Sequence, residues 1–214
     1  MALRKGEQTR DAILWAAIVR FGRDGYRSTA VADLARDAAV SGTLAYAYFP
    51  NKEALFLAAV DEDAAAVINE GLSTILDDPH AGPDDWREAL LVTLVAAVDR
   101  HPLARRLLAG LEPDVTDRVL EIPALAELRK ACVERLRTEQ AAGLVRSDID
   151  AAAIANGMVT IILSLLMSVV QLGGGAAGTY GSDVTAVFEA ALGRAGAGGR
   201  RRPGRSSTAR PPRR

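Results

Sequence analysis

The sequence has few side chains suited to redox or metal chemistry, and this scarcity excludes several classes of protein. One cysteine in 214 residues rules out an internal disulfide framework and fits a reducing cytoplasm. The two histidines, His80 and His101, have no carboxylate or cysteine at metal-ligand spacing. His-Glu-x-x-His and Cys-x-x-Cys motifs are absent, and the glycines at 173–175 follow a predicted helix rather than a strand. We therefore predict no enzymatic activity, no metal and no cofactor.

Aromatic residues are also scarce, at 5% of the chain, whereas alanine and leucine are abundant. This balance favours an all-α fold, because alanine and leucine have high helix propensity. A hydrophobic content of 49% and a charged content of 25% are ordinary for a soluble globular protein. The length allows one or two domains with a substantial core.

The net charge of −1 conceals an uneven distribution along the chain. Residues 1–52 hold eight Lys/Arg and five acidic residues (+3), and the last twenty residues hold seven Arg and no acid (+7). The segment between them holds eleven basic and twenty-two acidic residues (−11). A cationic end on an acidic body predicts that one face, rather than the whole molecule, meets nucleic acid.

Residues 29–52, TAVADLARDAAVSGTLAYAYFPNK, have the pattern of a helix-turn-helix. Thr29 is the expected N-cap of a first short helix, and Ser41 offers a second N-cap after a turn. The second helix runs from Gly42 to about Ala47 and ends before Pro50, and Asn51 caps the next helix. In a helix-turn-helix the second helix enters the DNA major groove.

The second short helix carries side chains suited to DNA contact. Small and hydroxyl-bearing residues at its start allow close approach to base edges, and phenol or ammonium groups at its end can bind phosphates. A single tyrosine is more simply explained by packing, and a single lysine by a charge exposed to solvent. The prediction therefore depends on the order and spacing of all these residues together. The residues predicted to bind DNA are Thr29, Ser41, Gly42, Thr43, Tyr46, Tyr48 and Lys52.

At these positions the chain resembles the tetracycline-repressor (TetR) family of bacterial transcription regulators. The matching residues span positions 10–55, about a fifth of the chain: Arg10, Ile13-Leu14, Ala17, Phe21, Gly25-Tyr26, Thr29, Val31, Leu34-Ala35, Val40-Ser41, Tyr46, Tyr48-Phe49, Lys52-Glu53 and Leu55. Two positions depart from the family pattern. Ala39 replaces the usual turn glycine, and a left-handed alanine there costs about 1 kcal/mol. The Gly-Thr-Leu run at 42–44 arrives one residue early, so the operator sequence does not follow from the family.

The segment before the helix-turn-helix predicts a supporting helix that ends near Gly25. The start of the chain, MALRKGEQTR, has no apolar core and does not resemble a signal peptide. Its basic residues Arg4, Lys5 and Arg10 fit either a basic arm that touches DNA or a frayed helix start. Trp15 falls beside the apolar stripe of the helix, and we assign it to packing.

We expect about nine helices in two domains, with a helix-turn-helix domain at 1–50 and a helical ligand-binding and dimerisation domain at 51–194. Helical patterns cover about 51–76, 84–99, 102–110, 123–142, 151–172 and 182–193, with a proline-interrupted segment at 113–122. GGGAAGTYG at 173–181 is expected to be a flexible link. The arginine-rich tail at 195–214 is predicted to be disordered. It either adds sequence-independent DNA affinity or serves only as a solubilising tail.

Residues 151–170 contain no charge and are long enough to span a membrane. Against a membrane span, Asn156, Thr160, Ser164 and Ser168 form a polar stripe, and no basic or aromatic belt flanks the segment. We therefore predict a helix buried in a soluble protein. The family resemblance implies that the last two helices, 151–172 and 182–193, form a four-helix interface in a homodimer, which buries this apolar surface.

The resemblance implies a ligand-responsive regulator, most often a repressor, that binds a palindromic double-stranded DNA operator as a cytoplasmic homodimer. A small apolar or amphipathic effector would enter the body, shift the helix that begins after Asn51 and weaken DNA binding. The alternative is a constitutive or architectural DNA-binding dimer without an effector. The candidate pocket residues, each of which fits plain core equally well, are Leu94, Leu108, Leu128, Cys132, Asn156, Met158 and Ile162.

Overall fold

The computed structural model describes residues 2–173 and 175–193, and within them it confirms the all-α prediction. These residues form nine α-helices, one 3-10 helix and no strand. The predicted disordered tail, 195–214, lies outside the described residues. The elements are α1 (Ala2–Asp24), α2 (Val31–Asp37), α3 (Gly42–Tyr48), α4 (Lys52–Asp77), α5 (Pro83–Val98), α6 (Pro102–Leu108), η1 (Pro113–Glu121), α7 (Pro123–Ala141), α8 (Ala151–Leu172) and α9 (Gly175–Leu192).

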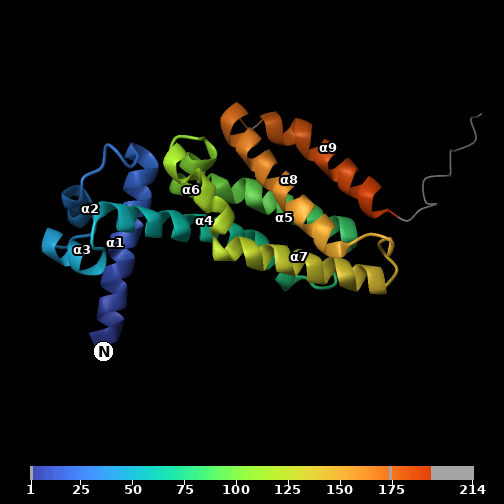
Figure 1. Cartoon of the computed structure of the whole chain (residues 1–214), viewed down its shortest axis with the longest axis horizontal. Coiled ribbons are helices and arrows are strands. Elements are labelled where there is room, and N and C mark those ends of the chain that lie inside the picture. Colours follow the sequence, from blue (N-terminus) through green and yellow to red (C-terminus); the bar gives the residue numbers. More distant parts are fainter. Residues whose placement is uncertain (1, 174, 194–214) are drawn as a thin grey trace, which may run out of the picture.

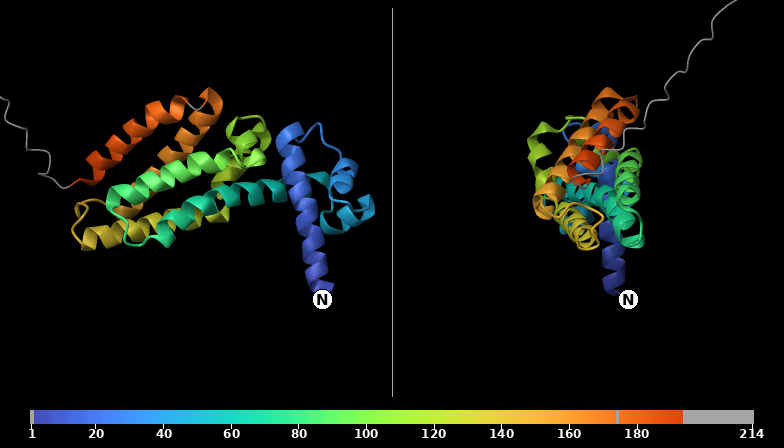
Figure 2. Two further views of the ribbon diagram at one scale, coloured as in Figure 1. Left: turned by 180° about the vertical axis from the view of Figure 1, so that it is seen from behind. Right: turned by 90° about the vertical axis from the view of Figure 1, so that its right-hand side faces the viewer.

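Helices α1–α3 lie at one end of the molecule, and α4 leads from them into a body formed by α5–α9 (Figure 1). The view from behind shows the same arrangement (Figure 2). Buried apolar side chains form two clusters, one at each part. Helix α4 contributes to both, with Val60 in the first cluster and Ala64 in the second. Leu103 and Leu107 of α6 belong to the cluster of α1–α3, so α6 is anchored to this end of the molecule.

Local sequence signals set most of the helix starts. Ser41 caps α3 by accepting the Leu44 N–H at 3.2 Å, as predicted. Asn51 caps α4 by accepting the Ala54 N–H at 2.7 Å, also as predicted. Prolines occupy the first position of α5, α6 and α7, where a missing N–H costs no helical hydrogen bond.

Two predictions about helix ends are wrong. Ala30 is the N-cap of α2, without a side-chain cap, because the hydroxyl of Thr29 donates instead to the Gly25 carbonyl at 2.8 Å. The predicted flexible link at 173–181 is largely helical, since α9 begins at Gly175 rather than at Ser182. Glycine lowers helix propensity by about 1 kcal/mol, but packing of α9 along α8 overrides this preference.

Helix α8 is the one described helix that is long and apolar enough to cross a membrane, with a mean hydropathy of 2.2. A third of its most apolar stretch is buried within this chain, including Ala155, Met158 and Ile162. The hydroxyl groups on its outer face donate to carbonyls one turn earlier, as Thr160 does to Asn156 at 2.9 Å. The helix therefore has the character of a core helix with one further face to cover.

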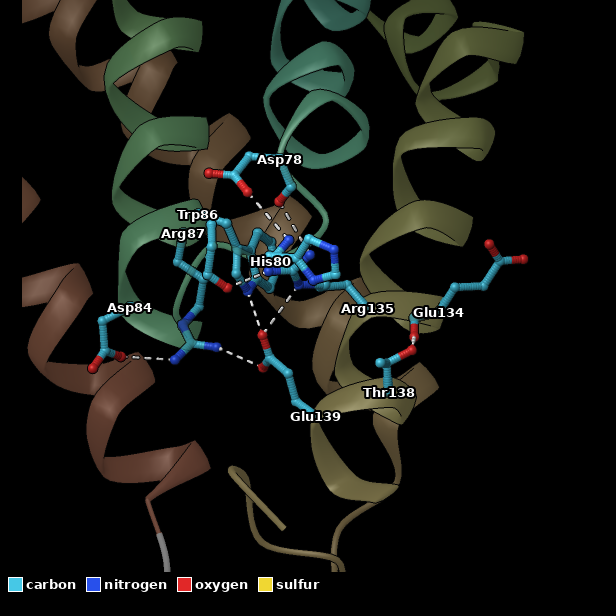
Figure 3. A network of polar contacts seen from close by, with 10 residues as sticks. Asp78, His80, Asp84, Trp86, Arg87, Glu134, Arg135, Thr138 and Glu139 are labelled. Carbon is cyan, nitrogen blue, oxygen red and sulfur yellow. Dashed lines mark hydrogen bonds and ion pairs between the residues drawn. The ribbon is translucent and has the colours of Figure 1, made fainter. Parts of the chain in front are cut away.

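A buried ionic cluster joins elements of the body (Figure 3). Glu139 of α7 is 3% exposed and accepts hydrogen bonds from Trp86 Nε1 at 2.6 Å, Arg87 Nη1 at 3.2 Å and Arg135 Nε at 3.4 Å. Arg135 also donates to the carbonyls of Asp78 and Ala81 in the α4–α5 loop. One carboxylate thus joins α5, α7 and this loop.

Candidate DNA-binding surface and internal cavity

The turn between α2 and α3 has the unusual backbone that the sequence predicts. Ala39 is left-handed, with φ at +54°, and is the one described non-glycine residue with a positive φ. The Val40 N–H donates to the Ala35 carbonyl at 2.9 Å and closes the turn. This conformation costs alanine about 1 kcal/mol, which the packing of α2 and α3 must offset.

Helix α3 packs through one face and leaves the other open. Ala45 and the following Phe49 are buried in the cluster of α1–α3. Thr43, Leu44 and Tyr46 point away from this core, and Tyr46 is 52% exposed. Two of the residues predicted to bind DNA, Thr43 and Tyr46, therefore lie together on the solvent-exposed face of α3.

The start of α3 is open enough for close approach to another surface. Ser41 is exposed, and a side chain added at Gly42 would meet no atom within 4 Å. Both residues lie on the same helix end as Thr43, as the sequence predicts. This end can therefore come close to a flat or grooved partner without a clash from its own side chains.

The other residues predicted to bind DNA also make contacts within the protein. Tyr48 is half-buried against the cluster of α1–α3. The ammonium of Lys52 lies 4.4 Å from the centre of the Tyr26 ring, a favourable cation–π contact. Thr29 is 3% exposed and hydrogen-bonds to the backbone, so its side chain supports the loop before α2 rather than facing outward.

Helix α1 includes the basic start of the chain, and its outer face differs from prediction. The helix begins at Ala2, so the structure agrees with a helix start, one of the two alternatives for these basic residues. The guanidinium of Arg10 lies 5.5 Å from the centre of the Phe49 ring, next to the helix-turn-helix. Trp15, assigned to packing from the sequence, is 63% exposed because the first cluster is filled from the opposite side of α1.

Contacts from α1 fix the orientation of the helix-turn-helix. Arg20 donates to both carboxylate oxygens of Asp37 in α2, at 2.5 and 2.9 Å. This bidentate hydrogen bond is the main cause that holds the pKa of Asp37 below its ordinary value. Phe21 packs edge-on against Phe56 of α4, with ring centres 5.0 Å apart. The recognition surface is therefore tied to the start of α4.

Helix α6 joins this end of the molecule to the body. Pro102 lies so close to α1 that a side-chain carbon at Gly22 would come within 2.7 Å of it. The backbone N–H of Tyr26 and Nε of Arg106 both donate to Oε1 of Glu112, at 3.0 and 2.7 Å. The Tyr26–Glu112 contact links residues 86 positions apart and has no local signal in the sequence.

A second link joins α6 to α4 through Asp63, which is 2% exposed. Its Oδ2 accepts the N–H groups of Leu103 and Ala104 at 2.9 and 2.8 Å, so it caps the start of α6. His101 lies between two carboxylates, with Nδ1 2.8 Å from Asp63 Oδ1 and Nε2 3.0 Å from Glu70 Oε1. Each ring nitrogen of His101 therefore lies within hydrogen-bond distance of a carboxylate oxygen.

Sequence reasoning missed this link, which we call the Asp63–His101–Glu70 clamp. His101 was predicted to have no carboxylate at metal-ligand spacing along the sequence, and in space two carboxylates from α4 meet its ring. An acid in the middle of the apolar stripe of α4 was the available signal, because a buried carboxylate needs a partner. Within the described residues, no group of three or more His, Cys, Asp or Glu has the arrangement of a metal site.

A cavity of about 60 Å³ lies in the body between α4, α5, α6, α7 and α8. Every side chain that borders it is aliphatic. Most of these side chains come from α4, α6 and α8, and α6 lies on the side nearest α1–α3. The bordering residues are Ala64, Val67, Ile68, Leu94, Ala104, Leu107, Leu108, Leu125, Leu128, Val159, Ile162, Leu163 and Leu166.

Four of the seven predicted pocket residues border this cavity, namely Leu94, Leu108, Leu128 and Ile162. Cys132 and Met158 are buried in the same cluster but away from the cavity wall. Burial raises the pKa of the Cys132 thiol to about 12. Asn156 was wrongly placed, since it is exposed on the polar outer face of α8.

Comparison with known proteins gives a consistent match. Residues 13–59 match the family model described as bacterial regulatory proteins, tetR family. The HTH-type transcriptional repressor SCO4008 of Streptomyces coelicolor is 30% identical over 196 residues, which cover 85% of this chain and 92% of the relative. The HTH-type transcriptional repressor Rv1474c of Mycobacterium tuberculosis is 34% identical over 146 residues, or 65% of this chain and 71% of the relative.

Solved structures agree at the level of the fold. A TetR transcriptional regulator from Chloroflexus aurantiacus superposes with a TM-score of 0.68 at 22% identity, covering 88% of this chain and 98% of that one. A TetR-family regulator from Cytophaga hutchinsonii gives 0.68 at 18% identity, with coverage of 89% and 98%. The likeness extends from the helix-turn-helix through the helical body.

Proposed function

The chain belongs to the TetR family of bacterial regulatory proteins, and from this premise we propose that it is a homodimeric transcriptional repressor released from a palindromic operator by a small-molecule effector. The observation that carries the proposal is the outward face of α3, with Thr43, Leu44 and Tyr46 free of the core. The family consists of regulators rather than enzymes, in agreement with the sequence-based prediction.

The proposed DNA contacts come from the open end and outer face of α3. Ser41, Gly42 and Thr43 approach base edges, and Tyr46 reaches base or backbone beside them. Tyr48 and Lys52 contact phosphates at the flank with the parts of their side chains that remain accessible. Thr29 acts indirectly by holding the loop before α2 through its hydrogen bond to Gly25.

The proposed dimer forms through α8 and α9, which lie side by side on one side of the body (Figures 1 and 2). They leave large apolar side chains exposed, among them Ile161, Leu172, Tyr180 and Val187. Large apolar side chains exposed on neighbouring helices are suited to an association site in a soluble protein. A twofold axis through α8 and α9 gives two copies of α3, which read half-sites about 34 Å apart. Such a dimer needs no membrane and belongs in the cytoplasm, where the DNA is.

The proposed effector site is the aliphatic cavity in the body. Its volume is about 60 Å³. Ligand sites for drug-sized molecules measure about 300–1,000 Å³. An effector therefore has to move the walls apart, and two of those walls, α4 and α6, also contact the DNA-binding end.

This geometry supports a coupling route. A ligand that binds an expanded cavity more tightly than the closed one shifts the population toward the expanded form. Leu107 of α6 borders the cavity and also belongs to the cluster of α1–α3, so displacement of α6 reaches the DNA-binding end directly. The coupling is reciprocal, so DNA binding lowers the affinity for the effector by the same factor.

The alternative is a DNA-binding dimer without an effector, and the small size of the cavity favours it. Binding to the upstream DNA of its own gene against a scrambled duplex, at about 150 mM salt, tests whether the protein reads a DNA sequence or binds as an architectural protein. Specific binding by a dimer, tighter by about 10³ or more, supports a sequence-reading repressor. Equal binding to both duplexes supports the architectural protein instead.

A variant pair tests the role of α3. Tyr46→Ala is expected to weaken operator binding at least tenfold while the dimer unfolds at an unchanged temperature, because Tyr46 lies outside the core. Tyr46→Phe is the matched control, since it keeps the ring and separates its contribution from that of the hydroxyl. Loss of the fold in Tyr46→Ala would make this residue structural and remove it from the proposed contacts.

A further inference from the structure

We infer that the cavity selects an uncharged aliphatic group, a hydrocarbon chain or ring without any polar atom inside the site, and discriminates against cationic and anionic ligands. The inference rests on the proposed function in treating this cavity as the effector site. It goes further by naming the chemical class of the ligand from the composition of the wall.

The wall offers no partner to a polar ligand. All thirteen bordering side chains are Ala, Val, Leu or Ile, without an aromatic ring, hydroxyl, amide or charge. Their backbone groups lie within helices α4–α8 and are engaged there by helical hydrogen bonds. Where a backbone group at the wall has another partner, the partner comes from the protein itself: Gln171 Nε2 donates to the Leu108 carbonyl at 2.9 Å.

The charged groups next to the wall in sequence already have partners within the protein, since Arg105 pairs with Asp99 and Arg106 pairs with Glu112. Asp63 precedes Ala64, but its carboxylate accepts two backbone N–H groups of α6 and faces His101. Arg118 of η1 donates to both carboxylate oxygens of Asp61, at 2.8 and 2.6 Å. A ligand that carried a charge into the cavity would lose its hydration without gaining a counter-ion.

A cationic ligand would need a carboxylate or an aromatic face, and the wall has neither. An acid would need an N–H or guanidinium donor, which the wall also lacks. An alkyl chain needs only apolar contact, and each methylene that it buries tightens binding about fourfold. Affinity should therefore rise steadily with chain length until the expanded cavity is full.

The experiment compares three ligands that share a six-carbon chain: n-hexane, hexanoate and hexylammonium. Their binding to the full-length protein is measured at equal free concentrations as the rise in the midpoint of thermal unfolding. We expect n-hexane to raise the midpoint and the two ions to leave it unchanged. A shorter alkane, n-pentane, should bind about fourfold more weakly. Binding of either ion as tightly as n-hexane would overturn the inference.

Two wall variants locate the site. Ala64→Leu fills the cavity from α4, and Ala104→Leu fills it from α6 in case the first variant does not fold. Ala96→Leu on the exposed face of α5 is the matched control. We expect the n-hexane effect to fall at least tenfold in a folded wall variant and to persist in the control. Persistence in both wall variants would show that the hydrocarbon binds elsewhere and overturn the inference.

DNA release separates this inference from the proposed function. If n-hexane binds at the cavity and also lowers operator affinity, both are supported. If it binds there while operator affinity stays unchanged, the ligand class is supported and the proposed effector role fails. If the protein does not bind its operator at all, the thermal measurements still decide the ligand class.

Discussion

Ala39 holds the α2–α3 turn in a left-handed conformation that suits glycine better than alanine. Ala39→Gly should therefore raise the free energy of unfolding by up to about 0.5 kcal/mol, because relief of about 1 kcal/mol of strain is only partly offset by the extra entropy of the unfolded chain. The neighbouring Ala38 has an ordinary φ of −79°, so Ala38→Gly should instead lower the free energy of unfolding by about 0.5–1 kcal/mol. Urea unfolding of both variants measures the two shifts, and a shift in the same direction for both would contradict this account of the turn.

Residues whose roles depend on their immediate neighbours were predictable from the sequence. Ser41 and Asn51 cap the helices that they precede, because the acceptor and the free N–H groups lie within three residues. Thr29 has the same capping chemistry, yet it hydrogen-bonds backwards to Gly25. The choice between the two directions depends on how the loop packs against α1 and α4, which periodicity does not reveal.

Glu139 acts at the scale of helix packing, because it neutralises two arginines that are buried with it. Glu139→Ala leaves Arg87 and Arg135 without their shared carboxylate and should lower the free energy of unfolding by about 3–5 kcal/mol. Glu134→Ala on the exposed face of the same helix is the control and should stay within about 0.5 kcal/mol of the wild type. Thermal unfolding measures both, and equal effects would mean that the cluster in Figure 3 adds no net stability.

The Asp63–His101–Glu70 clamp predicts a pH dependence of stability. The hydrogen bond from His101, and then that from Arg100, lowers the pKa of Glu70 below its ordinary value. A carboxyl group with a lowered pKa stabilises the fold above its ordinary pKa, and this contribution disappears as the pH falls through the lowered value. The free energy of unfolding should therefore decrease on acidification below about pH 4.3, the ordinary value for glutamate.

Glu70→Gln is the test of the clamp, because the amide keeps the shape and removes the titration. The variant should be less stable than the wild type near pH 7, and the difference should narrow as the pH is lowered toward 3. Glu88→Gln on α5 serves as the control for removing an acid from the body. An unchanged difference across this range would assign the effect of Glu70 to packing rather than to its charge.

At the scale of elements, proline and capping signals placed most helix starts, whereas α9 was placed too late. The prolines that begin α6 and α7 were informative because their effect is local, whereas Pro83 at the start of α5 was placed in the preceding loop. The start of α9 is rich in glycine, and its helical state depends on contact with α8. The residues that border the aliphatic cavity were only partly predictable. The apolar stripes of α5–α8 identify core residues, but which of these residues border empty space depends on how the helices pack in three dimensions.

The whole molecule has an internal asymmetry that the sequence already indicates. The acidic, aliphatic body is joined to the basic helix-turn-helix through α4 and α6, and the links include both apolar packing and the clamp. Trp15 departs from this pattern, because it was expected inside and lies on the surface. Its position beside an apolar stripe gave no indication of which side of α1 would face the core.

The dimer proposal makes the most far-reaching prediction at this scale. Ile161 of α8 and Val187 of α9 are exposed within one chain but would be covered in the dimer. Ile161→Glu combined with Val187→Glu should convert a particle of twice 22.6 kDa into one of 22.6 kDa in sedimentation, because burying two new carboxylates in each subunit is costly.

Leu76→Glu on the exposed end of α4 is the matched control and should leave the dimer intact. The monomeric variant should also lose operator affinity by far more than half, because each α3 then binds its half-site alone instead of as one of a linked pair. A monomer that still binds the full operator with wild-type affinity would separate dimerisation from DNA recognition. The proposal that α8 and α9 set the spacing of the two recognition helices would then be wrong.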